Sequence, residues 1–182
     1  ILHLACAAPG RGVFYGRWEG GRWSVELVDA ETAGTEAAVT TRPSVRVYSL
    51  SKAGLVAQEQ KGSGWIKALM APAASGRISL KATDAGGQPE VFLLNHGAAR
   101  GMELERFLPR RHQGGLSWYR SFVAVPDKPA AFAAGGAAQE RWVSILTEGG
   151  RVFLVSRSNQ VVPIEIRNAK PDIVSSNLAG NQ

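Results

Sequence analysis

The run from Arg141 to Arg167 constrains the fold most strongly, because it contains three short alternating stretches separated by tight turns. It reads RWVSILTE, GG, RVFLVSR, SNQ and VVPIEIR. Stretches of this length that are rich in β-branched and aromatic residues and bounded by Gly, Ser and Asn are typical of an antiparallel meander. Pro163 lacks a backbone donor, so we expect the last stretch to lie at the edge of its sheet.

Stretches of the same form occur along the whole chain. Four of them align as hairpins, at residues 12–23, 45–65, 90–107 and 151–166. Each begins with a β-branched or aromatic triplet, turns through Gly, Ser or Asn, and returns through an alternating strand. Regular strands with Gly-rich turns and little helix predict an all-β, antiparallel fold of hairpins and meanders. This fold is either β-propeller-like or a β-sandwich or barrel.

The length of 182 residues and the ordinary hydrophobic content predict one well-buried core. We expect a single β domain at residues 1–168 and a polar tail at residues 169–182. An Ala-, Pro- and Gly-rich surface connection is expected at residues 126–138. No apolar run approaches the roughly 18 residues that suggest a membrane-spanning helix, so no transmembrane segment is predicted.

The second hairpin carries the most specific pattern in the chain, SVRVYSLSKAGLVAQEQKGSGW at residues 44–65. Its VRVY strand, the turn at Gly54, the strand bearing Glu59 and the GSGW exit resemble the repeat of fucose-binding six-bladed β-propeller lectins from fungi and bacteria. In that family an arginine and a glutamate hydrogen-bond sugar hydroxyls, and an aromatic ring stacks on the sugar. The resemblance therefore implies that Arg46, Glu59 and Trp65 bind a ligand.

The other hairpins depart from this pattern, because Phe14, Phe92 and Phe153 stand where the arginine is expected. A second interpretation of the three residues stays open. Arg46 and Glu59 on neighbouring strands also fit a cross-strand ion pair, and Trp65 also fits a core anchor.

Other function classes have weaker patterns. Cys6 with His96 or His112 is a candidate nucleophile and base for a secreted enzyme or toxin domain, although neither histidine has a supporting motif. The net charge of +6 and the five tryptophans make nucleic-acid binding on a basic β framework a further alternative. The histidines and the single cysteine are too dispersed to indicate a metal site, and no cofactor-binding motif is present.

The sequence therefore favours a binding or interaction module over an enzyme, with carbohydrate as the first ligand class to test. An arginine-rich basic surface suits anionic or sugar-bearing partners. We expect an extracytoplasmic or secreted protein that forms a homo-oligomer or part of a larger assembly, with no cofactor.

Overall fold

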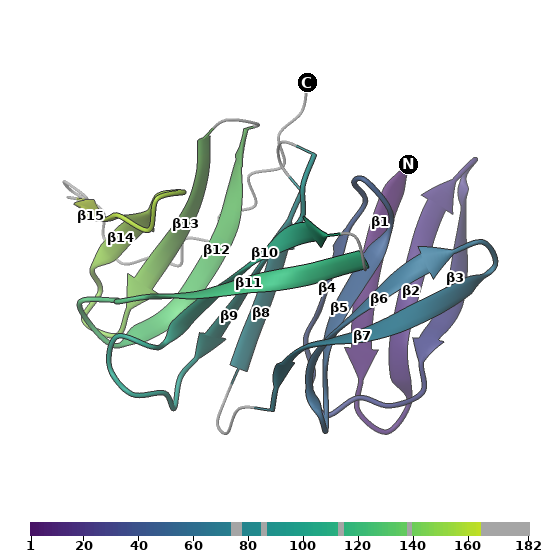
Figure 1. The fold of residues 1–182 in the computed structure, drawn as a ribbon, viewed down its shortest axis with the longest axis horizontal. Helices are drawn as coiled ribbons and strands as arrows, with labels where there is room; N and C mark the ends of the chain where they lie inside the picture. Colours follow the sequence, from purple (N-terminus) through teal and green to yellow (C-terminus); the bar gives the residue numbers. More distant parts are fainter. Residues whose placement is uncertain (74–77, 85–86, 113–114, 138–139, 165–182) are drawn as a thin grey trace.

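The described residues form four antiparallel sheets that follow one another along the chain (Figure 1). This computed structural model describes residues 1–164 except 74–77, 85–86, 113–114 and 138–139. No helix occurs among these residues. The predicted all-β, antiparallel fold class is confirmed.

Every sheet is a meander in which strands that are consecutive in sequence pair side by side. The first sheet contains β1 (Leu2–Ala8), β2 (Gly12–Glu19) and β3 (Arg22–Asp29). The second sheet contains β4 (Ala37–Thr40), β5 (Arg46–Ser51), β6 (Gly54–Lys61) and β7 (Gly64–Pro72). The third sheet contains β8 (Ile78–Thr83), β9 (Glu90–Asn95), β10 (Leu104–His112) and β11 (Gly115–Val123). The fourth sheet contains β12 (Pro129–Ala137), β13 (Glu140–Thr147), β14 (Val152–Val155) and β15 (Val161–Ile164).

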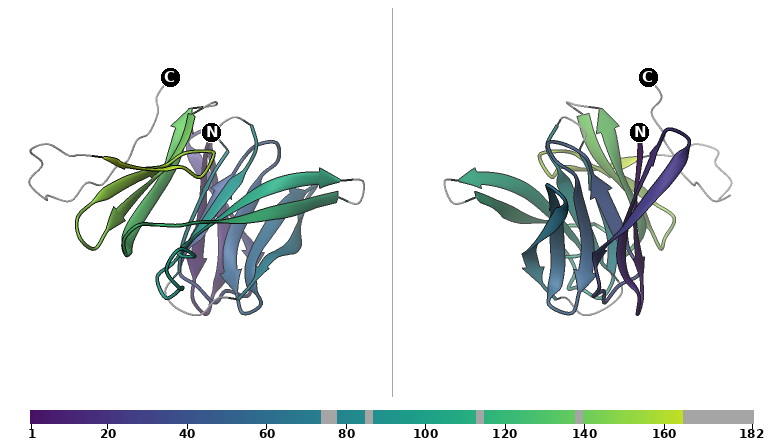
Figure 2. Two further views of the ribbon diagram at one scale, coloured as in Figure 1. Left: turned by 60° about the vertical axis from the view of Figure 1, so that its left-hand side comes forward. Right: turned by 90° about the vertical axis from the view of Figure 1, so that its right-hand side faces the viewer.

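The sheets pack through their first strands. β1 lies against β4, β4 against β8, and β8 against β12, so the four first strands form an inner row. The remaining strands of each sheet extend outward from this row (Figures 1 and 2). Meanders placed side by side around inner strands are the arrangement of propeller blades, so the fold is propeller-like and the four sheets form an arc.

Each contact between neighbouring sheets has its own hydrophobic cluster. Val13 and Val47 are both fully buried between the first and second sheets. Tyr48 and Phe107 anchor the cluster between the second and third sheets. Leu104 and Ile145 belong to the cluster between the third and fourth sheets. The core is therefore divided into three layers rather than gathered in one centre.

Gly54 allows the hairpin between β5 and β6 to pass close to the end of β7. Its φ is +137°, and a Cβ built there would lie 2.0 Å from the carbonyl oxygen of Ala71. Only glycine adopts this backbone conformation readily and leaves room for the neighbouring strand.

The structure confirms the predicted three-stranded meander, which forms β13, β14 and β15. Pro163 lies in β15, the edge strand of the fourth sheet as described, as expected for a residue without a backbone donor. The aligned hairpins at residues 12–23, 45–65 and 90–107 occupy the second and third strands of their sheets. The hairpin at 151–166 is displaced by one strand, since it begins with the third strand of the fourth sheet.

The predicted surface connection at residues 126–138 is wrong for most of its length. Pro129–Ala137 forms β12, the first strand of the fourth sheet, which packs against β8. Alternation of side chains explains this, because Phe132 is buried in the core while alanine and glycine occupy the positions around it. The polar tail at 169–182 lies outside the described residues, and the single-domain assignment stays a prediction.

Candidate functional site

Arg46 and Glu59 face each other across the central strands of the second sheet. Arg46 begins β5 and pairs directly with Glu59 on β6. The Arg46 guanidinium donates a hydrogen bond to Glu59 Oε1 over 2.9 Å, and Ser44 Oγ donates to the same oxygen over 2.7 Å. The Arg46 side chain is 7% exposed and the Glu59 side chain is 27% exposed. The pair is therefore held by the sheet register, and its carboxylate reaches solvent.

The face that carries this pair is turned toward the third sheet. Tyr48, two residues beyond Arg46 on the same face, is fully buried, and its ring meets that of Trp118 edge-on at 6.0 Å. Burial raises the pKa of Tyr48 to about 12, so its hydroxyl stays neutral. Trp118 belongs to β11 of the third sheet and is half-buried. Residues of two sheets thus meet beside the ion pair.

One donor at this position remains free within the described part of the chain. Arg46 Nε is buried and has no hydrogen-bond partner there. A buried guanidinium N–H without a partner loses its hydration without compensation. An acceptor from a bound molecule would offset that loss.

The structure brings Arg46 and Glu59 together but places Trp65 on the other face of the sheet. Glu59 pairs with Ile66 on β7, and adjacent residues of a strand point to opposite faces. Trp65 accordingly packs toward the first sheet, with its ring edge-on to Tyr15 at 5.4 Å. Its indole Nε1 is buried and has no partner in the described residues.

A second arginine–glutamate pair, which the sequence patterns missed, lies in the third sheet. Arg106 of β10 donates to Glu90 Oε2 of β9 over 2.9 Å, and the side chains are only 3% and 0% exposed. Glu90 begins β9 as Arg46 begins β5, so the two charges have exchanged strands. Aligning the hairpins by the first residue of the strand, rather than by the apolar triplet, places Glu90 at the position of Arg46 but does not identify its partner.

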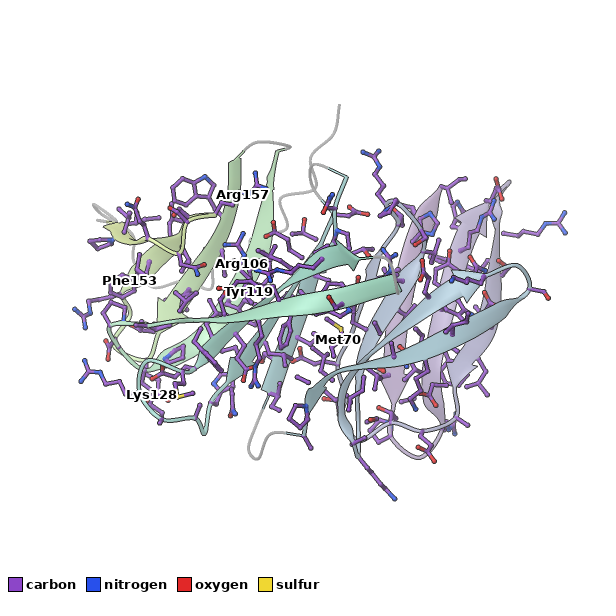
Figure 3. The ribbon with its side chains drawn as sticks, in the orientation of Figure 1. Met70, Arg106, Tyr119, Lys128, Phe153 and Arg157 are labelled. Atoms are coloured by element: carbon purple, nitrogen blue, oxygen red, sulfur yellow. The ribbon has the colours of Figure 1, made fainter. Side chains whose placement is uncertain are left out.

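Arg106 also ties the third sheet to the fourth. It donates to the backbone carbonyl of Arg157 and, over 3.0 Å, to Asn159 Oδ1, both in the turn between β14 and β15 (Figure 3). The small cavity beside Arg106 and Glu90 holds about 10 Å³, which is room for roughly one water molecule. The Arg106–Glu90 pair is thus more enclosed than the Arg46–Glu59 pair, and its contacts join the third sheet to the fourth. Arg106 Nε, like Arg46 Nε, is buried with no hydrogen-bond partner in the described residues.

The candidate nucleophile Cys6 and the candidate base His96 lie on or next to different sheets. Cys6 lies exposed on β1 of the first sheet, and His96 directly follows β9 of the third sheet. The second sheet lies between them. The His112 side chain lies outside the described parts. Where the structure is described, no group of three His, Cys, Asp or Glu residues is suitably placed to hold a metal ion, and no helix is long and apolar enough to cross a membrane.

The chain resembles known proteins in its fold but not in its sequence. No family model matches the chain, and no curated protein matches it by sequence. Among solved structures, the chain is similar to SapL1 lectin in complex with α-methyl fucoside, with a TM-score of 0.65 and 18% identity. It is also similar to the N224Q mutant of Aleuria aurantia lectin with α-methyl-L-fucoside (TM-score 0.60, 14% identity) and with Fucα1-6GlcNAc (TM-score 0.58, 13% identity).

These similarities span 90% of this chain but only 55–58% of the lectin chains. The chain thus shares its fold with slightly more than half of each lectin. The fold of the chain therefore supports the resemblance to fucose-binding lectins that residues 44–65 indicate.

Proposed function

We propose that the chain is a carbohydrate-binding, lectin-like module in which Arg46 and Glu59 contact the sugar. The observation that carries this proposal is the Arg46–Glu59 pair, with its solvent-reaching carboxylate and its unpartnered Arg46 Nε. The similar structures are lectins with fucosides bound, which makes α-linked fucose the first ligand to test.

The chemistry of the pair suits sugar hydroxyl groups. A hydroxyl both donates and accepts, so one hydroxyl can accept from a guanidinium while another donates to the neighbouring carboxylate. Charge-assisted hydrogen bonds are stronger than neutral ones and impose a defined geometry. The strand register fixes both groups in advance, which lowers the entropic cost of binding. Trp118 offers an apolar surface on the same side of the second sheet.

The ligand-binding role expected for Trp65 remains a separate proposal, because Trp65 lies between the first and second sheets. Trp65→Phe retains a packed ring but removes the indole donor. If Trp65 binds sugar through Nε1, this variant weakens binding; if Trp65 is only a core anchor, affinity stays unchanged. Secretion also remains a prediction.

A glycan array followed by calorimetric titration with α-methyl fucoside tests the proposal. We expect Arg46→Lys and Glu59→Gln each to weaken binding at least about tenfold, since a hydrogen bond to a charged group contributes roughly 1.5–3 kcal/mol. Arg151→Ala is the control. It removes an exposed arginine that is ion-paired with Asp127 at 2.9 Å beside the fourth sheet, and its affinity should stay within about twofold of the parent chain.

Two results would contradict the proposal. One is no binding to any glycan by the folded chain. The other is binding that is the same in Arg46→Lys, Glu59→Gln and the parent chain. Binding to single-stranded nucleic acid that weakens steeply with salt would instead support the basic-platform alternative.

A further inference from the structure

The first sheet exposes an apolar face on the side away from the second sheet. We call this the leading face. Its residues share one side of three paired strands: Leu2, Leu4 and Cys6 of β1, Phe14, Gly16 and Trp18 of β2, and Trp23, Val25 and Leu27 of β3. None of these residues is charged. Leu2, Leu4, Val25 and Leu27 are 64%, 53%, 66% and 51% exposed.

Such a face is unusual for a sheet surface in water. An antiparallel sheet with one solvated face normally carries polar side chains there. The opposite face of the first sheet is also apolar where it packs on the second sheet, through Ala7, Val13 and Tyr15. The first sheet therefore has the side-chain pattern of a sheet packed on both sides, and a contiguous exposed apolar patch marks an interaction surface.

The tryptophans make the leading face suitable for close packing. Trp18 and Trp23 pair across β2 and β3 with ring centroids 5.6 Å apart. The Trp23 ring lies over Gly16, where a Cβ would be 3.3 Å from two ring atoms. Because Gly16 has no side chain, the large ring lies against the backbone of the sheet.

The fourth sheet exposes a second apolar surface at the other end of the arc (Figure 1). We call this the trailing face. Its residues are Ala131, Ala133 and Gly135 of β12, Trp142, Ser144 and Leu146 of β13, Val152 and Leu154 of β14, and Val162 and Ile164 of β15. Trp142, Leu146, Val162 and Ile164 are 37%, 44%, 46% and 38% exposed.

We propose that the trailing face of one copy docks against the leading face of a second copy. Each pair of neighbouring sheets buries apolar faces against each other, and among residues that the structure describes no sheet packs on the leading or the trailing face. The leading and trailing faces lie at opposite ends of one arc, so head-to-tail contact between copies buries both and continues the sheet-on-sheet packing already present. Contacts of this heterologous kind build rings when the geometry closes. The proposal goes beyond sugar binding and does not depend on it.

Two charge-introducing variants test the proposal through the mass of the purified chain in solution. Light scattering coupled to size exclusion, over a series of concentrations, should show masses above the 19.4 kDa monomer. Val25→Lys places a charge in the leading face and Leu146→Lys places one in the trailing face. Each variant alone should be monomeric. Leu69→Lys is the control, because Leu69 is 57% exposed on β7 and belongs to neither end face.

Mixing the two variants distinguishes head-to-tail docking from other assemblies. Val25→Lys keeps an intact trailing face and Leu146→Lys keeps an intact leading face, so an equimolar mixture should form one junction and stop at two copies. Cys6, the single cysteine, lies in the leading face and reports independently. Its reaction with a maleimide should be slower in the assembled parent chain than in Val25→Lys.

A monomeric parent chain at all concentrations would overturn the proposal. An assembly that survives either single lysine variant, or a mixture that stays monomeric, would also overturn it. Circular dichroism of each variant verifies that the sheets have formed, so that loss of assembly is not confused with loss of folding.

Discussion

Two arginine–glutamate pairs on corresponding strands differ in burial, and we propose a ligand-binding role only for the more exposed pair. Arg46 and Glu59 lie at a position where the carboxylate reaches solvent, and Arg46 keeps an unused donor. Arg106 and Glu90 are more enclosed; Arg106 donates to Glu90, Asn159 and a backbone carbonyl, and its Nε, like that of Arg46, is buried without a partner in the described residues. The two pairs therefore differ mainly in how far solvent reaches the glutamate side chain.

Replacement of Arg106 by methionine should destabilise the fold strongly. The change removes the counter-charge of the fully buried Glu90, and breaking a buried ion pair from one side costs roughly 3–5 kcal/mol. Chemical denaturation measures the change in the free energy of unfolding. The double variant Glu90→Gln with Arg106→Met should recover most of the loss, because neither position then carries a buried charge. A single variant as stable as the parent chain would contradict the structural role.

At the scale of elements, the pairing of residues across two strands could be predicted from the sequence where a tight turn fixes the register. The short turn at residues 52–53 pairs Ser51 with Gly54, and counting along the strands then places Arg46 opposite Glu59. The next turn, at residues 62–63, places Trp65 on the opposite face by the same counting. The Glu90–Arg106 pair could not be predicted in this way, because the long connection from Asn95 to Leu104 leaves the register open. β12 was missed because alanine and glycine are poor strand formers, and its place in the sheet depends on contacts with β8.

The junction between the first and second sheets should weaken in acid. Asp29 at the end of β3 pairs with Lys67 Nζ at 2.6 Å and accepts from Gln58 Nε2 at 3.1 Å. Burial tends to raise the pKa of Asp29, but the bonds from Lys67, the Glu31 backbone and Gln58 outweigh it and lower the pKa. The folded chain therefore keeps Asp29 ionised at pH values where the unfolded chain binds a proton. The stability from this group is complete above about pH 4 and is lost as pH falls through the lowered pKa.

Thermal unfolding between pH 2 and pH 7 tests this expectation. The melting temperature of Asp29→Asn should lie below that of the parent chain at pH 7, and the difference should shrink as the pH falls below about 4. A difference that stays constant over this range would show that the carboxylate's charge does not contribute.

At the scale of the whole molecule, the described residues form a row of sheets in which the main contacts are between neighbouring sheets. Most strands, although not β12, and the all-β class could be predicted from alternation and turn residues. The arc could not, because it depends on contacts between first strands such as β4 and β8 that no local pattern specifies. In such a row, stability is approximately a sum of sheet and nearest-neighbour terms.

Hydrogen exchange should therefore be faster in the end sheets than in the middle sheets. The comparison uses strands that are hydrogen-bonded on both sides, so that edge strands do not bias it. In a dilute sample, amides of β2 and β13 in the end sheets should exchange faster than those of β5 and β9 in the middle sheets, because an end sheet has a neighbour on only one side. Mass spectrometry of peptides from these four strands measures the rates. Equal protection in all four would mean that the row opens only as one unit.

The pairing of sequential strands also bears on how the chain folds during synthesis. Each sheet is made from one continuous stretch of chain, so its hydrogen bonds need only short loops to close. Short loops cost little entropy, and low sequence separation between contacts favours fast folding. A sheet can thus form on the ribosome soon after its last strand emerges, and the growing chain adds one packed layer at a time from the N-terminus.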